Sequence, residues 1–452
     1  MKTKCLLFLF ITFSFVSFAK AISFKGTILN ATDNEIVING LEFKKNIKLN
    51  TDGSFFDALD IKHNGLYTFI NGKNRWEIYL DVQADLEIFF DEENIDETIF
   101  FKGITAQENT YLFKKNKLYS TENFKPTFIY LLKEAEFVAL IEQVTNTNLN
   151  LLKSFNNVNE TFKKIEEKNI IFSNQNYYSS YKFSHSYYTK TNVQNAKICA
   201  SKIIKRDTLN FDDFKFSTVF RNYAFGKFSG AFRHKFEKKP ALVQQHLQEE
   251  LQKINNPVIE NYILQNLSVQ TNFYNDKDDL ILQAIISITN NKELKEKLTL
   301  KLENKETFVN GSQAPKFELL DQNGNAISLD SFKGKNIYID FWATWCKPCV
   351  AEIPDLKKLE EKFKSKNIVF LSISIDSPKD FEKWKNFIVK KDLGGIQLIA
   401  ENAWDSQIVK QYMVESIPRF VLIDTEGNLV DINAPRPSEA KIYKAINRLD
   451  KL

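Results

Sequence analysis

Residues 336–354 read NIYIDFWATWCKPCVAEIP, and no other stretch constrains the architecture of this chain as strongly. The stretch begins with an apolar run that is typical of a buried strand, and the residues after Pro348 are typical of a helix. Cys346 and Cys349 lie at the junction, although the whole chain of 452 residues has only four cysteines. Two cysteines at this spacing and in this place indicate a chemical role.

The position of Cys346 favours a reactive sulfur. Backbone N–H groups in the first turn of a helix lack intrahelical partners, and together with the helix dipole they stabilise a nearby anion. A thiol in this setting has its pKa lowered from about 8.5 towards 7 or below, and its thiolate can attack a disulfide. Cys349, one turn deeper, could resolve the mixed disulfide. Lys347 and Pro348 fill the gap, and Pro348 favours first-turn geometry.

Two carboxylates are candidates to accept the proton of the deeper cysteine. Asp340 interrupts the apolar strand, and Glu352 lies one turn beyond Cys349. A charged residue in a buried strand is costly unless it has a use, and burial favours a carboxyl group that takes up a proton near neutral pH. We expect both to act as general bases. The alternative is a solvent-facing Glu352 and an Asp340 with a purely structural partner.

Two other uses of the cysteine pair receive less support. A zinc site needs four ligands, and no cysteine follows Cys349. All four histidines lie upstream, in other regions, at His63, His185, His234 and His246. A purely structural disulfide would close a very short loop and contribute little stability. We therefore expect no metal and no cofactor beyond the redox-active cysteine pair.

The segment resembles the active site of the thioredoxin superfamily. WCKPC at residues 345–349, with the strand before it, is similar to the active-site strand and helix start of that superfamily. The continuation VAEIP resembles the exported ResA/TlpA-like branch, in which a glutamate three residues after the second cysteine is the buried proton acceptor. That residue is Glu352 here. Asp340 matches the buried aspartate of thioredoxin itself, and Pro354 matches the proline that kinks the active-site helix.

A second motif is SIPRF at residues 416–420. It resembles the segment that holds the cis-proline of the superfamily, and such a bond is uncommon in ordinary sequence. The resemblance implies that Pro418 faces the cysteines and that Ile417 offers backbone groups to an extended substrate, with Trp345 also in the substrate site. Arg419 stands where a small residue or threonine is frequent.

Strand and helix patterns alternate through the C-terminal region, residues 306–452. We expect strands at residues 336–342, 368–375, 396–400 and 419–424, helices at residues 349–364, 377–390, 405–412 and from 438, and a hairpin turning at Asn323 and Gly324. Such alternation builds a central sheet covered by helices. The resemblance spans about residues 311–452 and implies a thioredoxin-like α/β fold.

Two further regions precede this one, so the chain is expected to be multidomain. Residues 22–112 contain short β-branched and aromatic runs between turn signals, which predict an antiparallel, β-sandwich-like domain. Residues 113–305 have apolar residues at helical spacing, and helices are expected at residues 126–144, 258–269, 280–288 and from 291 to about 304. We interpret the aromatic-rich residues 177–188 as packing and Cys199 as a buried thiol.

The first 21 residues have the pattern of a signal peptide. Two lysines precede an apolar core at residues 6–18, and Ala19 and Ala21 form a small-x-small cleavage site. The core is short for a transmembrane helix, which needs about 20 residues, although an uncleaved anchor is the alternative. We expect cleavage near Ala21 and export to the periplasm or cell envelope, where disulfides persist. The net charge would fall from +4 to about +1, which does not indicate a nucleic-acid partner.

The expected function is that of an exported thiol–disulfide oxidoreductase. Its substrates would be exported proteins with disulfides, and a membrane thiol donor would supply electrons. The resemblance implies net reduction, with apocytochromes c as one target, whereas a DsbA-like oxidant is an alternative because direction depends on relative potentials. The oligomeric state is not indicated.

Two other functions stay open. A peroxiredoxin would have Thr or Ser three residues before its reactive cysteine and Pro four residues before that, where this chain has Ala343 and Ile339. A binding protein would act through residues 22–305 and keep the thioredoxin-like module as a docking scaffold. A Cys349→Ser variant that traps mixed disulfides would separate an oxidoreductase from a scaffold.

Overall fold

The computed structural model describes residues 21–119, 124–192, 196–202, 210–271 and 276–449. The predicted signal peptide therefore lies outside the described residues, apart from Ala21. Packing divides the chain into two compact units, Met1–Asn266 and Leu267–Leu452. The domain boundaries predicted near residues 112 and 305 stay predictions. Among the helices that the structure describes, none is long and apolar enough to cross a membrane.

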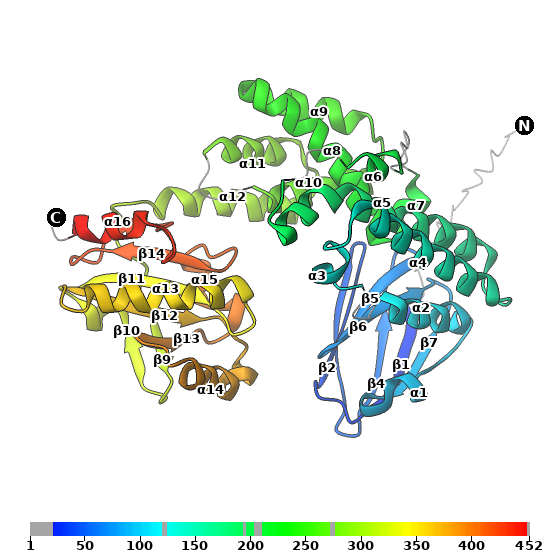
Figure 1. Ribbon diagram of the computed structural model, residues 1–452, viewed down its shortest axis with the longest axis horizontal. Coiled ribbons are helices and arrows are strands. Elements are labelled where there is room, and N and C mark those ends of the chain that lie inside the picture. Colours follow the sequence, from blue (N-terminus) through cyan, green and yellow to red (C-terminus); the bar gives the residue numbers. More distant parts are fainter. Residues whose placement is uncertain (1–20, 120–123, 193–195, 203–209, 272–275, 450–452) are drawn as a thin grey trace, which may run out of the picture. The chain divides into compact units, whose positions relative to one another are not determined.

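The first unit opens with two four-stranded sheets (Figure 1). The sheet orders are β4-β1-β7-β8 and β3-β2-β5-β6. The strands are β1 (Ile22–Leu29), β2 (Glu35–Gly40), β3 (Phe43–Lys48), β4 (Ser54–Leu59), β5 (Gly65–Asn71), β6 (Asn74–Leu80), β7 (Leu86–Asp91) and β8 (Phe100–Lys102). Side chains from both sheets, among them Phe24, Ile38, Phe69 and Ile88, share one core, as in a sandwich.

The N-terminal domain was predicted to be antiparallel, and one strand pair contradicts this. β1 runs antiparallel to β4 but parallel to β7. The chain between β1 and β7 passes through the other sheet, and so long a connection permits parallel pairing. At this pair a Cβ on Gly26 would lie 1.8 Å from the carbonyl oxygen of Ile88, so only glycine fits. Period-two alternation indicates which side chains are buried and does not indicate the direction of the neighbouring strand.

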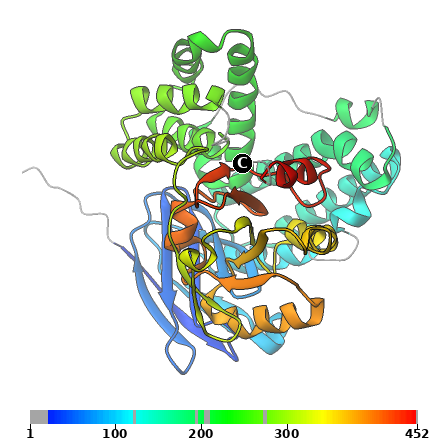
Figure 2. The same cartoon turned by 90° about the vertical axis from the view of Figure 1, so that its left-hand side faces the viewer.

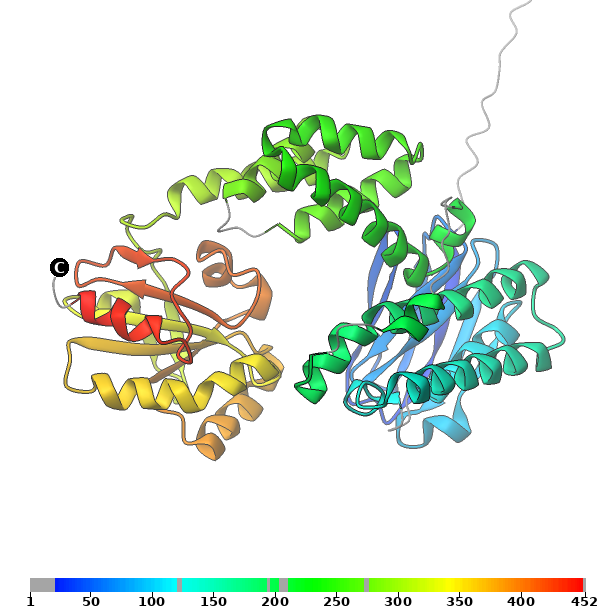
Figure 3. The same ribbon diagram turned by 45° about the horizontal axis from the view of Figure 1, so that its top comes forward.

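Helices follow the sheets in this unit (Figure 3). Among them, α2 packs on β6 and α7 contacts β5. Their bounds are α1 (Ile95–Thr98), α2 (Ala106–Tyr119), α3 (Pro126–Ile129), α4 (Glu134–Ser154), α5 (Glu160–Thr189), α6 (Lys197–Ser201), α7 (Phe211–Phe216), α8 (Thr218–Lys238), α9 (Val243–Gln252) and α10 (Pro257–Val269). The predicted helical character of this region is confirmed.

The helix predicted over residues 126–144 is wrong in one respect, because it is broken into α3 and α4. Lys133 is the N-cap of α4, and its backbone N–H donates a hydrogen bond to the Glu136 carboxylate at 3.1 Å. Ile129 and Phe137 are buried on either side of the break. Apolar spacing therefore continues through the break and does not reveal it.

The aromatic stretch at residues 177–188 lies in α5. Tyr178 and Tyr181 are buried and share a core with Cys199 of α6, so the packing interpretation is confirmed for them. Tyr187 is exposed. Cys199 is a free, buried thiol, and burial, with the nearby Glu134 carboxylate, raises its pKa to about 12.

The second unit contains a seven-stranded sheet of order β10-β9-β13-β12-β11-β14-β15. β11, β12 and β13 are parallel neighbours, and β14 runs antiparallel to β11. The strands are β9 (Glu318–Asp321), β10 (Ala326–Ser328), β11 (Asn336–Trp342), β12 (Ile368–Ser374), β13 (Ile396–Ile399), β14 (Arg419–Ile423) and β15 (Leu429–Asp431). Each of the predicted strands is present, as is the hairpin.

Helices cover both faces of this sheet. Leu356 of α13 and Ile446 of α16 pack with Tyr338 on one face, whereas Trp384 of α14 and Val409 of α15 belong to the core of the other face (Figure 2). The helices of this unit are α11 (Asp276–Ile288), α12 (Lys292–Thr307), α13 (Lys347–Phe363), α14 (Phe381–Lys391), α15 (Gln407–Gln411) and α16 (Lys441–Leu449). The predicted α/β architecture is confirmed.

Candidate active site

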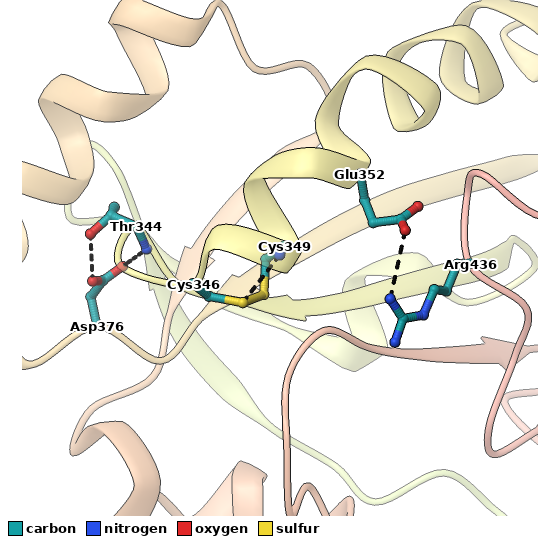
Figure 4. The surroundings of a disulfide bond; sticks show 6 residues. All are labelled: Thr344, Cys346, Cys349, Glu352, Asp376 and Arg436. Carbon is teal, nitrogen blue, oxygen red and sulfur yellow. Dashed lines mark hydrogen bonds and ion pairs between the residues drawn. A yellow bond between two sulfur atoms is a disulfide. The ribbon is translucent and has the colours of Figure 1, made fainter. Parts of the chain in front are cut away.

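β11 and α13 bring the cysteine pair to the end of the sheet. Cys346 is the N-cap residue of α13, and its Sγ accepts a hydrogen bond from the backbone N–H of Cys349 at 3.1 Å (Figure 4). Pro348 lies in the first turn, where its missing N–H leaves no intrahelical bond unmade. Cys346 and Cys349 form a disulfide in this structure, and each is only 4% exposed. The predicted strand-to-helix junction is therefore present.

Asp376 holds the loop that precedes the cysteines. Its carboxylate accepts hydrogen bonds from the backbone N–H of Thr344 at 2.9 Å and from the Thr344 hydroxyl at 2.7 Å (Figure 4). It also accepts one from the Ser374 hydroxyl at 2.7 Å. Asp376 is completely buried at the end of β12. The sequence reasoning missed it, although an acidic residue directly after an apolar parallel strand is a usable signal for a group near the active-site edge.

Glu352 is buried and fully engaged. Its two carboxylate oxygens accept hydrogen bonds from the backbone N–H and the hydroxyl of Ser438, each at 3.0 Å. The Arg436 guanidinium lies 3.8 Å from Oε1, and Figure 4 shows the carboxylate turned toward Arg436 and away from the sulfurs. Glu352 is only 9% exposed, so the solvent-facing alternative does not hold.

Asp340 is buried as well, but it lacks a full set of partners. Its Oδ1 has no hydrogen-bond partner among the described residues. Burial, followed by the negative charges of Glu352 and Glu360, raises the pKa of Asp340 to about 8. Asp340 and Cys349 line one small cavity, so the structure brings this carboxylate and the deeper cysteine together.

The predicted substrate residues lie around the mouth of the site. Trp345 is 50% exposed beside Cys346. The peptide bond between Ile417 and Pro418 is cis, as the motif predicted. Arg419, the residue after Pro418, pairs with Phe341 near the C-terminal end of β11. Pro418 therefore lies at the end of the sheet from which the cysteine loop emerges.

Two further residues were missed by sequence reasoning. Trp404 is 41% exposed, and its ring centroid lies 6.5 Å from that of Trp345. Glu360 lines the same cavity as Asp340, and burial raises its pKa to about 7 although Lys357 opposes the shift. An aromatic residue in a loop and a glutamate in a charged helix carry no distinctive sequence signal. Within the described residues, no group of three or more His, Cys, Asp or Glu side chains could hold a metal ion.

Comparisons with known proteins bear on the C-terminal part of the chain. The profile of the AhpC/TSA family matches residues 310–432. The thiol-disulfide oxidoreductase ResA of Bacillus subtilis (strain 168) is 32% identical over 143 residues, which are 32% of this chain and 77% of that protein. The chain belongs to the ResA family of thiol-disulfide oxidoreductases. ResA of Bacillus cereus (strain ATCC 10987 / NRS 248) is 36% identical over 120 residues, 26% of this chain and 66% of that protein.

Solved structures match the same share of the chain. The thioredoxin domain of a thiol-disulfide oxidoreductase from Bacteroides vulgatus is 29% identical, with a TM-score of 0.29, over 31% of this chain and 96% of that one. A thiol-disulfide oxidoreductase from Bacteroides fragilis is 26% identical, with a TM-score of 0.28, over 31% of this chain and 100% of that one. The two ResA matches at 36% identity span 66% of those relatives and 26% of this chain. The predicted thioredoxin-superfamily membership is confirmed for this part.

Proposed function

We propose that this protein exchanges disulfides through Cys346 and Cys349. The observation that carries the proposal is the backbone N–H of Cys349 directed at the Cys346 sulfur at the start of α13. In the dithiol form, this donor and the helix dipole stabilise negative charge on Cys346, which makes it the attacking sulfur. Cys349 lies within the first turn and acts second.

The exchange proceeds in two steps. The Cys346 thiolate attacks one sulfur of a substrate disulfide, the substrate S–S bond breaks, and one substrate thiolate leaves and takes a proton from solvent. Cys349 then gives its proton to Asp340, and its thiolate attacks the sulfur of Cys346. The disulfide between the two cysteines forms, the second substrate thiolate leaves, and two electrons have passed from the dithiol to the substrate.

Asp340 is the proposed proton acceptor for Cys349. It shares a cavity with Cys349, and its pKa of about 8 is close to neutral operating conditions, where a general base works best. Glu352 contributes through its negative charge, which helps to raise the pKa of Asp340, and through its contacts with Ser438. Glu352 was also expected to act as a general base, but in this proposal Asp340 alone carries the proton, because both oxygens of Glu352 accept hydrogen bonds from Ser438.

The substrate is proposed to dock at the exposed rim of the site. Trp345 and Trp404 offer apolar surface beside Cys346, and an aromatic side chain buries a large area at low entropic cost. Ile417 and Pro418 precede β14 and would present backbone groups to an extended segment of the substrate. Such a surface suits a locally unfolded polypeptide that contains a disulfide.

We further propose that the protein acts outside the cytoplasm as a reductase supplied by a membrane thiol donor. The signal-peptide pattern of the first 21 residues supports export. Exported disulfide proteins, including apocytochromes c, are the proposed substrates. The reduction potential of the cysteine pair, measured against a thiol buffer, tests the direction, because a potential as oxidising as that of DsbA would indicate net oxidation.

Trapping tests the exchange itself. Cys349→Ser, expressed with its own N-terminus in the original organism, should accumulate mixed disulfides with particular exported proteins through Cys346, because the resolving sulfur is gone. The matched control is the double variant that also carries Cys346→Ser, which should trap none. If the single variant also traps none, and purified wild-type protein reduces no disulfide, the oxidoreductase proposal fails in favour of a scaffold.

A further inference from the structure

A small cavity lies directly beneath the cysteine pair, between α13 and the strands β11, β12 and β13. About 10 Å³ in it is open to the centre of a water molecule, which is roughly the room that one water needs. Its lining residues are Asp340, Trp342, Cys349, Ile353, Leu356, Lys357, Glu360, Ser372, Leu393, Gly394 and Gln397. The deeper cysteine and two carboxyl groups, Asp340 and Glu360, therefore line one small cavity.

Three buried polar atoms of this lining lack protein partners within the described residues. They are Asp340 Oδ1, Trp342 Nε1 and Gln397 Oε1, and each residue is more than nine-tenths buried. The Gln397 amide is oriented by its Nε2, which donates to the carbonyl of Gly394 at 2.7 Å. The three atoms comprise two acceptors and one donor. A water molecule can donate two hydrogen bonds and accept at least one, so it matches this set.

Glu360 lines the cavity and also reaches solvent. Its side chain is partly exposed. Its carboxylate packs against the backbone of Gly394, so closely that a Cβ added to Gly394 would lie 2.4 Å from Oε2. Burial raises the pKa of Glu360 to about 7. Lys357, one turn away, opposes that shift and is itself paired with Asp392 at 3.3 Å. Glu360 is thus a carboxyl group that can change charge near neutral pH while touching both the cavity and solvent.

We propose that this cavity is a water site and that Glu360 is the group through which protons pass between Asp340 and solvent. The proposal rests on the proposed function, in which Asp340 takes the proton of Cys349. From Asp340 the proton passes to the water, from the water to Glu360, and from Glu360 to bulk solvent. Each transfer breaks one bond to hydrogen and forms another, and no oxidant or reductant takes part.

The charged groups around this route are few. Asp340 enters from β11; Glu352, Lys357 and Glu360 enter from α13; and Asp392 follows α14 and pairs with Lys357. β12 and β13 contribute only the neutral side chains of Ser372 and Gln397 to the lining. Glu360 acts through Asp340 and is therefore a positioning and relay residue.

A two-release assay isolates the step. Reduced full-length protein is mixed with an aromatic disulfide whose halves leave as coloured thiolates; the first release reports attack by Cys346 and the second reports attack by Cys349. Glu360→Gln removes the titrating group, and Gly394→Ala displaces its carboxylate without changing any charge. Glu361→Gln, at a side chain that is 76% exposed on the same helix, is the matched control.

In weak buffer we expect the second release to slow about fivefold or more in Glu360→Gln and measurably in Gly394→Ala, with the first release unchanged. A high concentration of a small buffer should restore both rates, because free buffer molecules then carry the proton. Glu360→Gln should also shift the pH midpoint of the second release downward, because a like charge near Asp340 is gone. Glu361→Gln should match wild type throughout.

Equal rates for Glu360→Gln and wild type in weak buffer would overturn the relay, and so would slowed rates that buffer does not restore. If Glu360→Gln unfolds, as thermal denaturation would reveal, Gly394→Ala decides by the same criterion. The proposed function is tested separately in the same assay. It fails if wild type shows no second release that depends on Cys349 or if Asp340→Asn leaves that release unchanged, whereas the relay alone fails if only the Glu360 and Gly394 variants behave as wild type.

Discussion

Asp340 carries an ionisable group into a strand that is buried along its whole length. Burial and two neighbouring carboxylates raise its folded-state pKa from 3.8 to about 8. The folded protein therefore keeps this proton over a pH range in which the unfolded chain has already lost it. The contribution of the protonated group to stability is fully present below the unfolded pKa and is lost as pH rises through the folded pKa.

Asp340→Asn should for this reason stabilise the protein at alkaline pH. We expect a gain in the free energy of unfolding on the order of 5 kcal/mol at about pH 8, which shrinks towards zero at about pH 4. Urea unfolding of the oxidised protein at the two pH values measures the difference. A gain of the same size at both values would mean that charge is not the cause.

Single residues of the site differ in how far the sequence reveals them. Cys346 and Cys349 are recognisable from their spacing, and Asp340 stands out because its neighbours are apolar. Glu360 does not stand out, because its importance comes from contacts with strands that are distant in the chain. In the sequence, one glutamate of a charged helix looks like any other, and only tertiary packing distinguishes the one that lines the cavity.

At the scale of elements, the loop between β11 and α13 depends on β12. Asp376, which is itself fully buried, accepts two hydrogen bonds from Thr344 and one from Ser374. These bonds fix the entry of the chain into α13 and thereby the position of Cys346 at its N-terminus. Charge-assisted hydrogen bonds of this kind are among the stronger ones in proteins.

Asp376→Ala should leave three donors without their acceptor and cost roughly 3 kcal/mol of stability. Asp376→Asn retains one carbonyl acceptor and should cost less. Differential scanning calorimetry compares the stability of wild type and the two variants. The rate of alkylation of reduced Cys346 reports whether the loop still holds this cysteine in place. If both variants unfold at the same temperature as wild type, the loop does not depend on this carboxylate.

Most elements could be predicted from the sequence because each carries its own period and its own turn residues. The exceptions share a cause. The parallel pairing of β1 with β7 and the break between α3 and α4 depend on what the segment packs against, and apolar spacing is the same with or without them. Local pattern specifies the buried face of an element, whereas its direction and its interruptions are tertiary properties.

At the scale of the whole molecule, the C-terminal sheet has a self-contained core. The two hydrophobic clusters on its faces draw all their buried members from between Phe308 and Leu449. A domain with its own core folds on its own in most cases. The segment of residues 306–452 therefore meets the physical requirement for an independent unit.

Residues 306–452 expressed alone should fold and perform both releases of the aromatic disulfide assay at rates within about twofold of the full chain. Far-ultraviolet circular dichroism and the assay itself provide the measurement. A fragment that is folded but inactive would mean that the upstream unit completes the site, and an unfolded fragment would place the domain boundary before residue 306.

The burial of Cys199 matters before the native state is reached. While the chain is still unfolded, the Cys199 thiol competes with Cys346 and Cys349 for any oxidant, and a disulfide between Cys199 and either of them would be wrong. Once α6 packs, burial and the Glu134 carboxylate suppress ionisation of this thiol. Folding of the helical region thus removes Cys199 from the competition, and among the cysteines that the structure describes only Cys346 and Cys349 remain able to pair.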